Sequence, residues 1–168
     1  SMVAHHGFEE DKLWLKGVKE NLARRPQGND RAQVKAIYVG QCDISLGNSY
    51  YFGKMLANKE QQEWARSGKL LFPNQGNRGT HVNISGMALT KYAPNRDDAI
   101  KLMRFLVGEE AQKIYAEVNY EFPVRAGVDL STLLKPYEGF KSDEISLIDF
   151  IKYRKDASIL VDQVGFDE

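Results

Sequence analysis

The stretch CDISLGNSYYFGKML, residues 42–56, changes from one local pattern to another. Residues 42–47 have the short apolar pattern of a strand, and a bend with Asn48 or Ser49 as the cap then leads into a helix. Tyr50 and Tyr51 stand in the first turn of that helix, about 100° apart, so both cannot lie on one buried stripe. At the carboxyl edge of a sheet, where open α/β folds bind ligands, both can overhang the edge.

The rest of the chain alternates between the same two patterns. Short strands between longer helices predict the α/β class. Asn29 or Asp30 can cap the second helix, and a capping-box pattern at Ser142 opens the last one, which we expect to be interrupted near Asp156. Strands are predicted for residues 42–47, 69–73 and 81–91, and helices for residues 8–25, 31–39, 49–56, 59–67, 93–119 with a break at Gly108, and 142–166.

Composition and charge exclude several classes of protein. The chain has 168 residues, 42% of them hydrophobic, which suits one soluble globular domain of about 100 to 200 residues. Lys plus Arg and Asp plus Glu both number 23, so there is no basic field to hold nucleic acid. The single cysteine, Cys42, excludes an internal disulfide and is interpreted as a buried thiol beside the first strand. No hydrolase, P-loop, dinucleotide or zinc-protease motif occurs, so we expect no enzyme activity.

The tyrosine pair has two interpretations from the residues alone. Tyr50 and Tyr51 can be ordinary packing or surface side chains, or they can bind a ligand. A metal would have to displace protons from two phenols whose usual pKa is about 10, which requires a hard cation. Ferric iron is such a cation, and phenolate oxygens suit it better than they suit Zn(II) or Cu(I).

Two longer stretches resemble a known family. NLARRPQGNDRAQVKAIYVGQCDISLGNSYYFGKML, residues 21–56, and NQGNRGTHVNISGMAL, residues 74–89, are similar to the bacterial ferric-iron-binding proteins, the solute receptors of iron(III) ABC transporters. The similarity covers essentially the whole chain, which would be the C-terminal half of such a protein. The resemblance implies an α/β fold like that of the type II periplasmic binding proteins, with one lobe nearly complete and pieces of the other.

The resemblance also implies a site and a division into lobes. Tyr50 and Tyr51 match the adjacent tyrosines that bind Fe(III) as phenolates in an interlobe cleft. Residues 1–80 would be a second-lobe segment with the tyrosines, residues 81–131 would belong to the first lobe, and residues 132–168 would return to the second. The remaining iron ligands would come from the N-terminal half, so we expect this chain alone to bind Fe(III) much more weakly than the whole protein.

A synergistic anion such as carbonate is implied as well. Asn48 matches a position that contacts phosphate in some relatives, but Asp30 stands where those proteins carry an amide, so phosphate is not expected. His5, His6 and His81 do not match the family's histidine; the first two are interpreted as an exposed loop pair. Three arginines that could serve an anion, Arg24, Arg25 and Arg78, are interpreted as solvated.

The same resemblance implies a location and a partner. The protein would be periplasmic, with a signal peptide outside this chain, and would deliver iron to a permease in the inner membrane. Two alternatives stay open: a binding protein of the same fold for an anion or a small organic solute, and an interaction domain with Tyr50 and Tyr51 as interface anchors.

Overall fold

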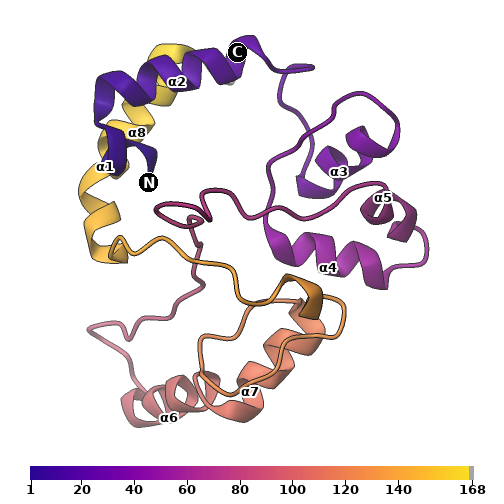
Figure 1. Cartoon of the computed structure of the whole chain (residues 1–168). Coiled ribbons are helices and arrows are strands. Elements are labelled where there is room, and N and C mark those ends of the chain that lie inside the picture. The colour runs from indigo at the N-terminus through magenta and orange to yellow at the C-terminus, as the bar shows by residue number, and fades with distance from the viewer. Residues whose placement is uncertain (167–168) are drawn as a thin grey trace. The chain divides into compact units, whose positions relative to one another are not determined.

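The computed structural model describes residues 1–166 and is built from helices joined by long connections (Figure 1). The first half contains α1 (Met2–His6), α2 (Phe8–Glu20), α3 (Asp30–Tyr38), α4 (Ser49–Ala57) and α5 (Gln62–Arg66). The second half contains α6 (Arg96–Leu106), α7 (Glu109–Ile114), the π-helix η1 (Tyr115–Asn119), the 3-10 helix η2 (Lys135–Tyr137) and α8 (Leu147–Val164). No helix in the described part of the chain is long and apolar enough to cross a membrane.

Several predicted helix ends are confirmed, and they are those that depend on local chemistry. The side chain of Asn29 accepts a hydrogen bond from the Ala32 N–H at 3.1 Å and caps α3. Gly108 separates α6 from α7, as predicted. Asn48 is the N-cap residue of α4, although its side chain makes no capping hydrogen bond to that helix.

Other predicted ends are wrong. Helix α2 stops at Glu20 and not at residue 25, because the Asn21 side chain donates to the Gly17 carbonyl at 2.8 Å and closes the last turn. The last helix begins at Leu147, where the Ser146 hydroxyl accepts a hydrogen bond from the Ile148 N–H, and not at the predicted capping box. It then continues to Val164 without the interruption predicted near Asp156.

The predicted strands are not formed. Within residues 1–166, β-type backbone pairing is limited to an isolated parallel bridge between Thr80 and Ser142. An extended segment becomes a strand only when a second backbone accepts its hydrogen bonds. Ile44 and Leu46, in the first predicted strand, are 83% and 93% exposed, so the described chain offers this segment neither a pairing partner nor a surface to cover its apolar side chains.

The chain forms two compact units. Unit 1 comprises residues 1–28, 72–82 and the segment from Lys141 onward, and its helices α1, α2 and α8 contact one another. Unit 2 comprises residues 29–71 and 83–140 and contains α3 to α7 with η1 and η2. The predicted lobe boundaries at residues 80 and 131 concern the whole protein and stay a prediction.

The core of unit 2 forms around α4. Phe52 and Met55 of this helix are buried with Ala65 and Leu134, and a ring of partly buried apolar side chains surrounds them. Gly53 lies on the same helix against Tyr120, so closely that a Cβ atom at residue 53 would be 2.5 Å from the Tyr120 Cβ. The missing side chain of Gly53 therefore lets α4 approach the segment that follows η1.

Replacing Gly53 with alanine tests this contact. Gly17, in the middle of α2, is the matched control, because a Cβ atom added there would meet no other part of the described chain within 4 Å. We expect Gly17→Ala to raise the free energy of unfolding by about 0.5 to 1 kcal/mol through helix propensity. We expect Gly53→Ala to lower it by about 1 to 3 kcal/mol, because Tyr120 must move. Urea unfolding measures both, and a gain in stability from Gly53→Ala would contradict the packing.

Candidate metal centre

Tyr50 and Tyr51 lie together at the beginning of α4. The backbone is extended at Asn48, with φ −80° and ψ 134°, and turns into the helix at Ser49. Both tyrosines are half-buried, and their ring centroids are 4.4 Å apart with 41° between the ring planes. Adjacent helical side chains project in different directions, but these two rings still lie in contact, as the predicted pair requires.

The contact changes the acidity of Tyr50. The hydrogen bond with the Tyr51 phenol raises the pKa of Tyr50, and burial and the charges of Tyr51, Asp30 and Glu121 act in the same direction. At neutral pH the Tyr50 side chain is thus a neutral phenol, and a metal ion that binds there must displace its proton.

Two cations flank the pair. The Arg31 guanidinium carbon lies 5.5 Å from the centroid of the Tyr51 ring, and the Lys54 Nζ lies 5.5 Å from that of Tyr50. The Arg31 Nε is buried and has no hydrogen-bond partner among the described residues. Sequence analysis missed both cations as neighbours of the tyrosines. Lys54 follows Tyr50 by four residues, a spacing that places two side chains on one helix face, whereas Arg31 comes from α3.

Asp30 also reaches the site from α3. One of its carboxylate oxygens accepts hydrogen bonds from the Asn48 backbone N–H at 2.8 Å and from the Asn48 side-chain amide at 3.2 Å. The backbone N–H and the side-chain amide of Asn48 therefore both donate to a carboxylate of the chain itself.

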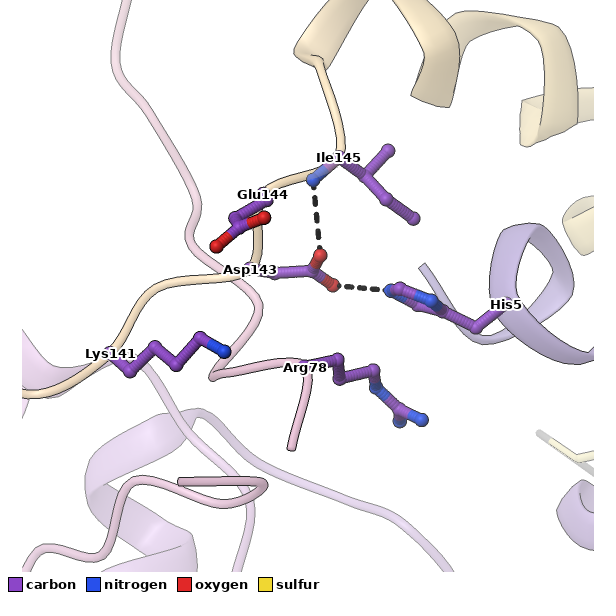
Figure 2. A pocket seen from close by; sticks show the side chains of 6 residues that line it. All are labelled: His5, Arg78, Lys141, Asp143, Glu144 and Ile145. Atoms are coloured by element: carbon purple, nitrogen blue, oxygen red, sulfur yellow. Dashed lines mark hydrogen bonds and ion pairs between the residues drawn. The ribbon is translucent and has the colours of Figure 1, made fainter. Parts of the chain in front are cut away.

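The histidines lie in unit 1. His5 and His6 belong to α1 and are half-buried, so the prediction of an exposed loop pair is wrong. His5 contacts the buried carboxylate of Asp143 at 2.7 Å, and Figure 2 shows this pair at a small cavity of about 280 Å³. Arg78 contacts His6 at 2.6 Å, so the prediction that its side chain is solvated is wrong.

His81 and Cys42 complete the candidates named from the sequence. The His81 and Phe150 rings meet edge to face with their centroids 5.1 Å apart, and desolvation lowers the pKa of His81. Cys42 is half-exposed and not buried as predicted, because the strand expected beside it is not formed. Within residues 1–166, no group of three or more His, Cys, Asp or Glu side chains is placed to hold a metal ion.

A family model described as bacterial extracellular solute-binding protein matches residues 1–141. The chain belongs to this family. It is a family of solute-binding proteins and not of enzymes, so the prediction that the chain is no enzyme is confirmed.

Named relatives of this solute-binding protein are longer than the chain. Iron uptake protein A1 of Synechocystis is 46% identical over 149 residues, which cover 88% of this chain and 41% of the relative. Iron uptake protein A2 of the same organism is 39% identical over 170 residues, which cover 99% of this chain and 49% of the relative. The chain therefore spans about half the length of the curated relatives it matches, or somewhat less.

Solved structures agree with the predicted fold class. The apo ferric ion-binding protein A of Pasteurella haemolytica superposes with a TM-score of 0.95 at 50% identity, over 99% of this chain and 52% of that structure. A Trichodesmium protein in complex with iron and citrate ligands gives a TM-score of 0.94 at 45% identity, over 99% and 53%. The chain thus has part of the α/β fold of type II periplasmic binding proteins, although its described residues form no strand themselves.

The His5–Asp143 pair predicts how stability depends on pH. Burial alone would raise the pKa of Asp143, but hydrogen bonds from His5 and the Ile145 N–H, with the charges of His5 and Arg78, lower it overall. A carboxyl whose pKa is lower in the folded chain stabilises the fold above its unfolded pKa, about 3.9, and this contribution is lost as pH falls through the folded pKa.

Asp143→Asn is therefore expected to lower the free energy of unfolding at pH 7 by about 2 kcal/mol. It should also remove part of the loss of stability that the unchanged chain shows on acidification below about pH 4. The exposed Asp156→Asn is the control and should change neither. Urea unfolding at several pH values measures both effects, and equal behaviour of the two variants would contradict the role of Asp143.

Proposed function

We propose that this chain is part of an iron(III)-binding component of an ABC transporter, and that Tyr50 and Tyr51 hold Fe(III) as phenolates. The observation that carries the proposal is the contact between the two phenol rings, 4.4 Å apart at the first turn of α4. Relatives named as iron uptake proteins and structures named as ferric-binding proteins support iron as the cargo.

The chemistry of the pair suits a ferric ion. Two phenolates supply hard oxygen ligands and two negative charges, which match a small trivalent cation. The raised pKa of Tyr50 means that the metal must displace a proton that the free site holds firmly. Iron binding then releases protons, so the affinity falls as pH drops. Arg31 and Lys54 lie near the rings and stabilise the negative charge that forms on the phenolate oxygens.

The remaining parts of the proposal concern the whole protein. Two tyrosines leave a ferric ion with open coordination positions, which further ligands from the N-terminal half and a synergistic anion such as carbonate would fill. The iron would lie in a cleft between two lobes, with residues 81–131 in the first lobe. The protein would work in the periplasm and pass its iron to a permease of the inner membrane, and the family's description as extracellular solute-binding proteins supports this location.

A ferric citrate titration with a visible spectrum tests the proposal. Phenolate bound to Fe(III) gives a charge-transfer band, and neutral tyrosines that stack on an organic solute or pack in an interface give none. We expect the band to grow with iron and to be lost in Tyr50→Phe and in Tyr51→Phe, since each variant removes one phenolate ligand. Tyr92→Phe is the control and should keep the band, because Tyr92 is 84% exposed and lies outside the site.

The titration is made on this chain and on a longer protein that includes the N-terminal half. A band in the longer protein alone would mean that the pair needs the missing ligands. A band that survives both phenylalanine variants, or no band in either protein, would contradict the assignment of iron to Tyr50 and Tyr51.

A further inference from the structure

Asp30 connects the beginnings of two helices that are 18 residues apart in the sequence. It is the first residue of α3, and its side chain reaches Asn48, the residue before α4. A single carboxylate oxygen accepts both Asn48 hydrogen bonds, at 2.8 Å from the backbone N–H and 3.2 Å from the side-chain amide. Hydrogen bonds to an ionised acceptor are about twice as strong as those between neutral groups.

The surroundings hold Asp30 in place for this contact. Asn29 caps α3 through the Ala32 N–H, which fixes the backbone on which Asp30 stands. On the other side, a Cβ atom at Gly47 would lie 3.3 Å from the same Asp30 oxygen, so the turn before α4 approaches the carboxylate closely. The Asp30 carboxylate thus fits between α3 and the backbone of the turn at residues 47–48.

We infer that Asp30 is a positioning residue for the tyrosine pair. Asn48 is two residues before Tyr50, and its carbonyl accepts the Tyr51 N–H at 3.2 Å in the first turn of α4. A bond that fixes the Asn48 backbone therefore fixes the start of the turn from which both phenols project. The carboxylate acts through Asn48 and not on the iron itself. The inference therefore rests on the proposed function only in the experiments that use iron as the probe.

A simpler role for Asp30 would be that of an acid in the first turn of α3, where the helix dipole favours negative charge. The two roles predict different behaviour for Asp30→Asn. Asparagine lacks the charge that the dipole favours but keeps an oxygen that can accept from the Asn48 N–H. A positioning role is therefore largely preserved in Asp30→Asn and lost in Asp30→Ala.

The experiment compares Asp30→Ala and Asp30→Asn with Asp43→Ala, a control at an exposed aspartate in the same segment. In iron-free protein, hydrogen exchange at the Asn48 amide should be about tenfold faster or more in Asp30→Ala, because a charge-assisted hydrogen bond is lost. It should stay within a few-fold of the unchanged chain in Asp30→Asn and in the control.

In the ferric citrate titration, the charge-transfer band of Asp30→Ala should be weaker or shifted, because the phenols no longer share one fixed arrangement. Asp30→Asn should restore the band toward that of the unchanged chain. If Asp30→Ala does not fold, Asn48→Asp replaces it, since a second carboxylate repels Asp30 and removes the side-chain donor. It should show the same faster exchange and altered band.

Unchanged exchange at Asn48 in Asp30→Ala, or a band equal to that of Asp43→Ala, would overturn the inference. So would an Asp30→Asn variant that behaves like Asp30→Ala. Failure of the proposed function looks different: no protein would show a band, while the exchange of iron-free protein would still respond to residue 30.

Discussion

The position of α4 is the constraint on which the candidate site depends. Its middle lies against Tyr120, an approach that is possible because Gly53 has no side chain. Phe52 and Met55 of the same helix anchor it in the core of unit 2. Its first turn, which carries the tyrosines, is thereby held at a fixed place on the surface of a packed unit, and a ligand site gains precision from such rigid support.

The charges around the tyrosines come from α3, α4 and the segment that follows η1. Arg31 and Lys54 lie over the tyrosine rings, whereas Asp30 and Glu121 raise the pKa of Tyr50 and so help to keep it protonated. Tyr50 is thus a neutral phenol at neutral pH in the free site, and a metal ion that binds it must displace its proton. Under the proposed function, the need to displace this proton favours Fe(III), a cation of high charge density, over softer divalent ions.

Local chemistry made part of this structure predictable from the sequence. The Asn29 cap, the break at Gly108 and the first turn at Tyr50 and Tyr51 depend on a few neighbouring residues, and the pattern indicated each of them. The strands and the Asp30–Asn48 contact depend on backbone or side chains far along the chain. Leu71, for example, lies in a predicted strand but is 78% exposed, and no local signal says that the described chain lacks its pairing partner. The chain spans about half the length of its curated relatives, which agrees with the lack of pairing partners for the predicted strands.

Iron binding by the tyrosine pair is tested most directly by anomalous diffraction at the iron edge, from crystals of the ferric-loaded longer protein. We expect one strong peak within bonding distance of the phenolic oxygens of both Tyr50 and Tyr51, at the first turn of α4. A peak bound to only one of these oxygens, or at a site formed by other residues, would contradict it.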